Sequence, residues 1–213
     1  MKEEITAPKE HWNRAYLGRK TEELGWYEED PQPSLDLIEG LGLAKDARQL
    51  HVGVGASTLI DHLLEKGYTS LIATDISAEA LKRLQSRLGS QQDKVEWVID
   101  DLVHARTLPH MEPVQLWHDR AVLHFFVEES DRASYVQLMK KVIAPGGFAI
   151  IATFSMEGAH LCSGLPVHRY DAPALEELIG DEFRMVKSFD YTFKNPRDED
   201  RPYVYTLFQR VNN

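Results

Sequence analysis

Short apolar runs alternate with amphipathic stretches along most of the chain. Between the runs, apolar side chains recur at helical spacing, as at Ala80, Leu81, Leu84 and Leu88, a predicted helix that Ser77 caps. The five runs predicted as strands cover residues 50–54, 70–76, 95–101, 114–117 and 148–154. This alternation predicts a parallel sheet with helices on both of its faces.

The C-terminal part departs from this alternation. Two strands are predicted close together, at residues 183–191 and 203–211, joined by a polar, proline-containing stretch that is typical of a hairpin loop. They would bring the sheet to seven strands, one of them antiparallel. The other helices are expected from residues 9, 33, 57, 129 and 173 onwards. We expect residues 155–170 to be irregular, residues 1–42 to form a helical cap or lid, and residues 43–213 to form the main domain.

The first predicted strand ends in a tight turn that contains Gly53, Val54 and Gly55, and a helix is expected to open at Ser57. Glycines allow a ligand to approach the backbone, and the N-terminus of a helix offers free N–H groups. Asp75 closes the next strand, 20 residues after Gly55, where such units place the acid that binds ribose hydroxyls. The pattern predicts a site for a nucleoside-containing cofactor.

Composition narrows the function classes. The 213 residues carry a formal net charge of −10, and their basic residues are scattered, so we expect no nucleic-acid partner. Neither a membrane-spanning run nor a secretory signal is recognisable, which makes a cytoplasmic location the expectation. Cys162 is the sole cysteine, and the histidines form no ligand pattern, so no metal site is predicted.

Four motifs follow one another along the chain: HVGVGAS from His51, DIS from Asp75, DL from Asp101 and LWHDR from Leu116. In this order they resemble the class I S-adenosylmethionine-dependent methyltransferase family, and the Pro-Gly-Gly turn before the fifth strand is also typical of that family. The stretches WHDRAVLHFF and CSGLP are similar to those of a bacterial subgroup of small methyltransferases. The resemblance implies a single Rossmann-like domain, S-adenosylmethionine as cofactor and S-adenosylhomocysteine as product.

The resemblance also implies roles for individual residues. Gly53, Val54 and Gly55 would approach the methionine part of the cofactor, and Asp75 would accept hydrogen bonds from the ribose. The other positions that it assigns to the cofactor are Ile76, Asp101, Leu102 and His118. His51 departs from the family, which usually has an acid there to hold the ammonium group of the cofactor. A protonated His51 would repel that group, so affinity is expected to fall at acidic pH.

Catalytic candidates follow the fourth strand. His118 and Asp119 are predicted as a base and its orienter or as cofactor contacts; alternatively, Asp119 caps a turn and pairs with Arg120. Methyl transfer depends mainly on alignment, so no catalytic triad is required, and none is recognisable. Trp12, Tyr16, Trp26 and Tyr27 are predicted to cover the cofactor or, alternatively, only to pack on the sheet.

Substrate contacts are predicted at four positions: His124, Cys162, Arg169 and Tyr170. The alternatives are a buried core histidine at 124, an inert thiol at 162, and an ion pair of Arg169 with Asp171 or a surface glutamate. The predicted acceptor is a small molecule, and a protein lysine is the alternative. An NAD-dependent oxidoreductase and a non-catalytic cofactor-binding module are alternatives of another class, although Thr58 replaces the third glycine of the NAD fingerprint.

Overall fold

A seven-stranded sheet forms the centre of the protein, seen in a computed structural model that describes residues 8–55 and 57–212. The strand order is β3-β2-β1-β4-β5-β9-β8, and β9 alone runs antiparallel to its two neighbours, β5 and β8. The strands are β1 (Gln49–Val52), β2 (Leu71–Asp75), β3 (Val95–Ile99), β4 (Val114–Arg120), β5 (Ile143–Phe154), β8 (Phe183–Lys194) and β9 (Asp200–Arg210). The predicted fold class, including the antiparallel strand of the C-terminal hairpin, is confirmed.

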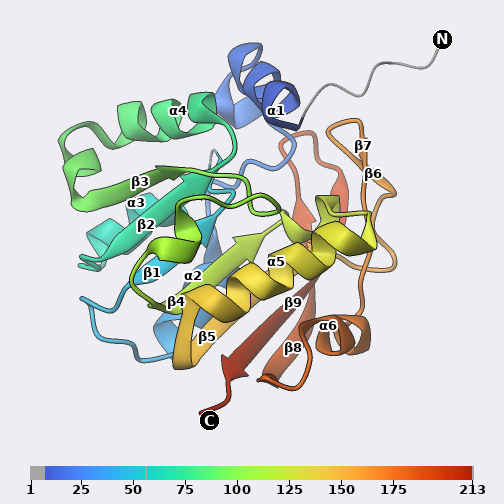
Figure 1. Ribbon diagram of the computed structural model, residues 1–213. Coiled ribbons are helices and arrows are strands. Elements are labelled where there is room, and N and C mark those ends of the chain that lie inside the picture. The colour runs from blue at the N-terminus through green and yellow to red at the C-terminus, as the bar shows by residue number, and fades with distance from the viewer. Residues whose placement is uncertain (1–7, 56, 213) are drawn as a thin grey trace.

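Helices cover both faces of this sheet, with α5 and α6 on one side and α2 and α3 on the other (Figure 1). The α-helices are α1 (Pro8–Leu17), α2 (Gln32–Gly40), α3 (Leu59–Glu65), α4 (Ala78–Leu88), α5 (Glu129–Val142) and α6 (Ala172–Ile179). Short 3-10 turns occupy Thr21–Glu23, Gly89–Lys94, Leu108–His110 and Leu123–Phe125. A small hairpin, β6 (Leu161–Cys162) and β7 (Leu165–Pro166), interrupts the segment that was predicted to be irregular.

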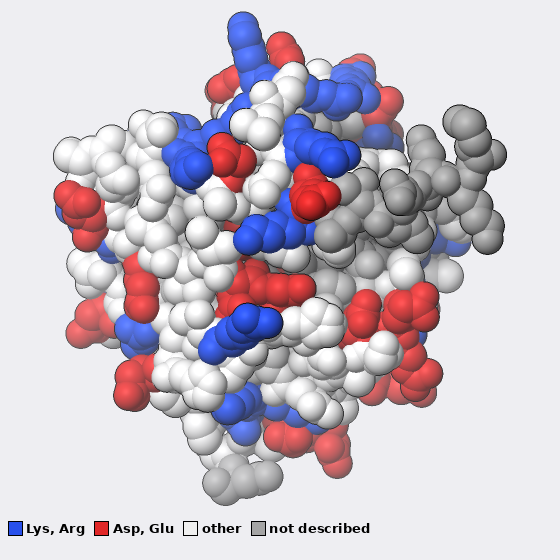
Figure 2. Space-filling model, turned by 45° about the horizontal axis from the view of Figure 1, so that its top comes forward, with Lys and Arg blue, Asp and Glu red and all other residues white. Residues whose placement is uncertain are grey.

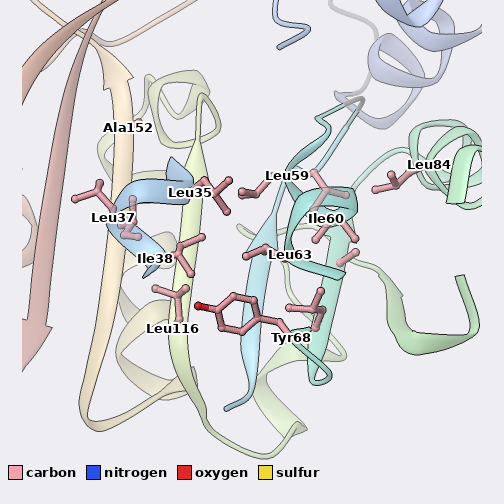
Figure 3. Close-up of a cluster of buried hydrophobic side chains, with 14 of the residues drawn as sticks. Leu35, Leu37, Ile38, Leu59, Ile60, Leu63, Tyr68, Leu84, Leu116 and Ala152 are labelled. Carbon is pink, nitrogen blue, oxygen red and sulfur yellow. The ribbon is translucent and has the colours of Figure 1, made fainter. Parts of the chain in front are cut away.

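Alternate side chains of each strand enter different cores. Leu71 and Ala73 of β2 pack with α2, α3 and α4, whereas Ile72 between them packs with α5 and α6. Figure 3 shows the first core, where leucines of α2 and α3 meet Leu116 of β4. Because both faces are covered, polar ligands have access to the sheet only beyond its strand ends.

Several boundaries differ from the sequence prediction, and three of them lie next to motifs that the prediction used. The helix expected from Ser57 begins at Leu59, because the Ser57 hydroxyl accepts a hydrogen bond from the Leu59 N–H (3.1 Å) and occupies the turn before it. Strand β4 continues beyond Trp117 to Arg120. Strand β5 already begins at Ile143, so the Pro-Gly-Gly turn lies within the strand, where its pairing with β4 shifts register.

The N-terminal part packs on the domain in two places. Helix α1 lies on α4 (Figure 1), and Tyr16, Leu24 and Ala80 form a small third core with the aromatic side chains of Trp12 and Trp26. Helix α2 instead belongs to the main core, so a domain boundary at residue 42 stays a prediction. Within the described ranges, no helix has the length and apolarity that crossing a membrane requires.

Candidate functional site

A cavity of about 340 Å³ lies beyond the carboxyl ends of β1, β2 and β4, next to the loop after β3. The N-terminal segment and the β6–β7 hairpin border it on the opposite side. Its lining residues include Trp12, Tyr16, Trp26, His51, Gly53, Val54, Asp75, Ile76, Asp101, Leu102, His118, Arg120, Phe125, Cys162 and Leu165. Most of the predicted cofactor positions therefore lie together, as the parallel order of the strands requires.

The turn after β1 requires its glycines. Gly53 (φ +56°) and Gly55 (φ +49°) both have left-handed backbone conformations, which disfavour any residue with a Cβ. A Cβ on Gly53 would lie 2.1 Å from Cγ2 of Val122, and one on Gly55 would lie 2.3 Å from the Tyr16 hydroxyl. Gly53 lines the cavity, while Gly55 lies just behind it, under Tyr16.

Asp75 fixes this turn through its side chain. Its carboxylate accepts hydrogen bonds from the Gly55 N–H (3.0 Å) and the Ser77 N–H (2.8 Å), and it lines the cavity. Burial raises the pKa of Asp75 to about 6, although these backbone N–H donors oppose the shift. A carboxylate has about four acceptor positions, so Asp75 keeps capacity for a ligand donor.

The two neighbouring acids after β3, Asp100 and Asp101, have different hydrogen-bond partners. Asp100 accepts hydrogen bonds from the N–H groups of Asp101, Arg106, Thr107 and Leu108, which holds the loop closed. Burial alone would raise the pKa of Asp100, but these donors outweigh it and lower the pKa. The carboxylate of Asp101 accepts one hydrogen bond from the described residues, from the Val103 N–H (2.9 Å), so it is more available to the cavity.

Two histidine rings form the inner wall of the cavity, with centroids 5.4 Å apart. Burial lowers the pKa of His51 to about 3, and burial, aided by the neighbouring ring and Arg120, lowers the pKa of His118 well below its usual value. Both are therefore neutral near pH 7. His118 Nε2 hydrogen-bonds to the Ser34 hydroxyl (2.9 Å), whereas neither ring nitrogen of His51 has a partner among the described residues.

A buried ion pair joins the N-terminal segment to the end of β4. Arg120 Nη2 lies 2.8 Å from Glu28 Oε1, in a contact without hydrogen-bond geometry, and both side chains are almost fully buried. The guanidinium also donates to the Trp26 carbonyl (3.3 Å) and lies over the rings of Phe193 and Tyr203. The sequence analysis missed this pair and had offered Asp119 as the partner of Arg120. An acid 92 residues away from Arg120 gives no local signal.

Three of the four predicted aromatic residues reach the cavity. Trp12, Tyr16 and Trp26 line it, and edge-to-face contacts join Trp26 to both of the others. The Trp26 indole N–H also donates to the Tyr16 hydroxyl (3.0 Å). Tyr27 packs beside this cluster but is not part of the lining. Trp12, Tyr16 and Trp26 thus line the cavity and also pack in the small third core with Ala80 of α4, and their contact with the cofactor stays a prediction.

Two catalytic or substrate candidates lie behind the cavity. Asp119 is fully buried and accepts hydrogen bonds from the Val122 N–H, the Leu123 N–H and the Tyr135 hydroxyl. It caps a turn, and no hydrogen bond joins it to His118 among the described residues. His124 is also fully buried, and its Nδ1 accepts from the Phe154 N–H (3.3 Å). Asp119 therefore caps a turn, as the alternative interpretation held, but does not pair with Arg120, and His124 is the buried core histidine of its alternative.

Of the remaining substrate candidates, Cys162 lines the cavity, whereas Arg169 and Tyr170 do not. Arg169 donates to the carbonyls of Met156 and Gly158 and forms no ion pair with any acid that the structure describes, and Tyr170 is buried in the core with α5 and α6. Cys162 does line the cavity, and burial raises the pKa of its thiol to about 11. Phe125 and Phe126 also line it and were missed, although their place directly after β4 could have indicated this.

Comparison with known proteins agrees with this geometry. Residues 50–147 match the model of a methyltransferase domain family, and this match includes all four motifs and the glycine turn. Residues 50–147 are a methyltransferase domain, and the chain has the fold of class I S-adenosylmethionine-dependent methyltransferases. The comparison with curated proteins found no match.

Solved structures share the fold of this methyltransferase at low identity. One, from work on the conversion of a disulfide bond into a thioacetal group during echinomycin biosynthesis, is 19% identical with a TM-score of 0.77, covering 96% of this chain and 94% of the other. The N-methyltransferase NodS of Bradyrhizobium japonicum with S-adenosylhomocysteine is 14% identical with a TM-score of 0.70 and coverages of 95% and 97%. The 1,6-didemethyltoxoflavin-N1-methyltransferase of Burkholderia thailandensis is 19% identical, with a TM-score of 0.66 and coverages of 85% and 78%.

The cavity of this methyltransferase suits the cofactor chemically. Its glycine turn leaves room that a Cβ would fill, Asp75 and Asp101 offer carboxylate oxygens, and the partnerless ring nitrogens of His51 lie in the wall. Aromatic faces on the opposite side suit a sulfonium cation. Among the described residues no group of three metal-ligating side chains is found, so none offers a metal site beside it.

Proposed function

We propose that the protein transfers a methyl group from S-adenosylmethionine to a small-molecule acceptor. The observation that carries the proposal is that the cavity is partly enclosed. Trp12 and Trp26 of the N-terminal segment and Leu165 of the β6–β7 hairpin border a space of the size that small ligands occupy. A side chain on a folded protein would have to pass this border, whereas a metabolite is small enough to be enclosed.

The same proposal assigns roles to the cavity residues. Asp75 would accept the ribose hydroxyls, Asp101 would bind the adenine amino group, and Ile76 and Leu102 would pack on the adenine. His51 takes the place of the usual acid near the ammonium group. Because it is neutral, its lone pair can accept one hydrogen bond without repelling a cation.

The reaction requires alignment more than acid–base chemistry. The cofactor supplies a methyl group activated by a sulfonium. A lone pair of the acceptor forms the bond to the methyl carbon, the carbon–sulfur electron pair goes to sulfur, and an acceptor proton goes to solvent. His118 has a strongly lowered pKa and binds Ser34, so we infer that it positions the reactants rather than acting as a base.

A titration of intrinsic tryptophan fluorescence tests the cofactor assignment, since Trp12 and Trp26 border the cavity. S-adenosylhomocysteine should quench it and NAD should not. A transfer assay with radiolabelled S-adenosylmethionine then separates the acceptors, with label expected in the metabolite fraction of an extract. Label found only on protein lysines would favour the alternative acceptor and overturn the small-molecule proposal.

A further inference from the structure

A second cavity, of about 610 Å³, adjoins the cofactor cavity. Trp26 and Cys162 line both, so these two side chains form the shared wall. In Figure 1 the loop between β8 and β9 rises beside α1 and the β6–β7 hairpin, and residues of these segments line the second cavity, which is open to solvent on one side. Phe154 and Tyr203, which pair across β5 and β9, contribute its floor.

The side chains of this second cavity carry charge of one sign. Arg14, Arg19, Arg197 and Arg201 line it together with His11, and no Asp or Glu does so among the described residues. We call it the arginine pocket. The whole chain, by contrast, has a net charge of −10, and acidic and basic side chains are mixed on the face drawn in Figure 2. A purely basic cavity is therefore a local feature of this molecule.

Two of the four arginines are not used by the fold. Arg201 pairs with Glu199, and Arg14 lies 3.8 Å from Glu10 at the exposed surface. The side chains of Arg19 and Arg197 make no hydrogen bond or ion pair with any described residue. Guanidinium groups that the fold does not use remain free to bind an anion.

The side chain of Asn195 stabilises the turn that carries Arg197. Asn195 is 5% exposed, and its side-chain oxygen accepts hydrogen bonds from the Arg197 N–H and the Glu199 N–H (both 2.9 Å). Its amide nitrogen donates to the Glu199 carboxylate (2.8 Å). The turn thus fixes the backbone at Arg197 and keeps Glu199 engaged with Asn195 and Arg201, away from the lining of the pocket.

We propose that the arginine pocket binds an anionic group, a carboxylate or a phosphate, of the methyl acceptor. The proposal rests on the proposed function, because the acceptor would extend past Trp26 and Cys162 to bring its nucleophile to the cofactor cavity. Guanidinium groups match the planar oxygen pairs of such anions and would repel the ammonium of a lysine. The pocket thereby selects against the alternative acceptor.

Fractionated metabolites test this proposal. A cell extract freed of protein is separated on an anion-exchange column, and each fraction is incubated with the enzyme and radiolabelled S-adenosylmethionine. Acceptor activity should concentrate in the retained, anionic fractions. Activity confined to the unretained fractions would overturn the arginine pocket and leave the proposed function intact. No activity in any fraction, despite bound cofactor, would count against both small-molecule proposals.

Variants connect that activity to the pocket. The double variant R19Q/R197Q should lower labelling in the anionic fractions at least tenfold, while its dissociation constant for S-adenosylhomocysteine changes less than twofold. Arg184→Gln is the matched control, since Arg184 lies at the opposite end of β8 and hydrogen-bonds to Gln209. R19K/R197K keeps both charges and should retain most activity. Unchanged labelling by R19Q/R197Q would overturn the proposal.

A phosphatase step separates the two anion classes. Treatment of the active fractions with alkaline phosphatase before the assay should abolish labelling if the pocket recognises a phosphate monoester. Retained labelling would assign a carboxylate or a phosphate diester, which this treatment leaves intact. In either case R19Q/R197Q must lose activity relative to Arg184→Gln, because both classes require the same guanidinium groups.

Discussion

The two cavities differ in how the chain builds them. The cofactor cavity is formed mainly by residues 51–126, where each strand is followed directly by its own polar loop, and backbone N–H groups fix its acids. The arginine pocket is assembled from α1, the β6–β7 hairpin and the β8–β9 loop, and α1 is separated from the other two segments by well over a hundred residues. Local sequence motifs therefore describe the first cavity, whereas only the folded chain defines the second.

The Arg120–Glu28 pair connects the two regions. Arg120 ends β4 at the cofactor cavity, and Glu28 belongs to the N-terminal segment that borders both cavities. Thr58, just before α3, adds a second link, because its hydroxyl donates to the carbonyls of Glu28 and Glu29 (both 3.1 Å). Breaking this connection is the strongest test of whether the two regions depend on each other.

Replacing Arg120 with Met should produce the largest effect. It leaves the Glu28 carboxylate buried without a counter-charge, which costs about 3–5 kcal/mol of unfolding free energy. Urea denaturation followed by circular dichroism measures this loss. The double variant E28Q/R120M removes both charges and should recover a large part of it. If R120M alone is as stable as the wild type, the pair does not hold the segment in place.

Particular residues show what the sequence could and could not reveal. Gly53, Asp75 and the cap at Ser77 were placed correctly, since strand ends and helix caps depend on neighbours within a few residues. Asp119 was predicted as catalytic because it follows His118, but its three donors come from a later turn and from Tyr135 on α5. Sequence proximity cannot distinguish a carboxylate that faces a ligand from one that caps a turn.

The same limit applies to the second cavity. Arg14, Arg19, Arg197 and Arg201 look like scattered surface charges in the sequence, and the strand pairing of β8 with β9 is what brings the last two beside α1. The expected short polar hairpin loop was correct, but its function depends on where the hairpin docks. The charge composition of the chain therefore described the average surface and gave no sign that four arginines gather at one cavity.

Asp75→Ala should weaken binding of S-adenosylhomocysteine by about 1.5–3 kcal/mol, the range for a hydrogen bond to a charged group. Isothermal titration calorimetry measures this change. The substitution also leaves the Gly55 N–H without its acceptor, so a thermal-unfolding scan of the variant must accompany the calorimetry. Asp100→Ala is the matched comparison, because it removes a loop-holding acid and should lower stability more than affinity. Unchanged affinity in the Asp75 variant would remove this acid from the ribose site.

Cofactor affinity should fall about tenfold between pH 7 and pH 5. The pKa of Asp75 is about 6, and protonation removes an acceptor that a ribose donor requires. His51 has a pKa of about 3 and stays neutral in this range, which corrects the expectation that its protonation would cause the loss. Calorimetric titrations at several pH values measure the trend, and Asp75→Asn should flatten it.

Fold stability should have the opposite pH dependence. The folded-state pKa values of Asp75 and Asp119, both about 6, lie above those of the unfolded chain. Their stabilising contribution is therefore fully present below about pH 4 and is lost as the pH rises through 6. The contribution of these two carboxyl groups to the unfolding free energy should therefore not decrease when the pH falls from 7 to 5. A parallel loss of stability and affinity would show that the affinity change reports unfolding.

The smallest effect is expected at Cys162, which belongs to both cavities. Since burial raises its pKa to about 11, the thiol is almost entirely protonated at pH 8 and should react with iodoacetamide about 100-fold more slowly than a free thiol. The chain has one cysteine, so the rate of mass increase reports this side chain alone. Cys162→Ala should change the dissociation constant of S-adenosylhomocysteine less than twofold, because the thiol contributes only a small apolar contact. Rapid alkylation would instead mean that Cys162 is a thiolate. The wall between the cofactor cavity and the arginine pocket would then contain a reactive group and not an inert one.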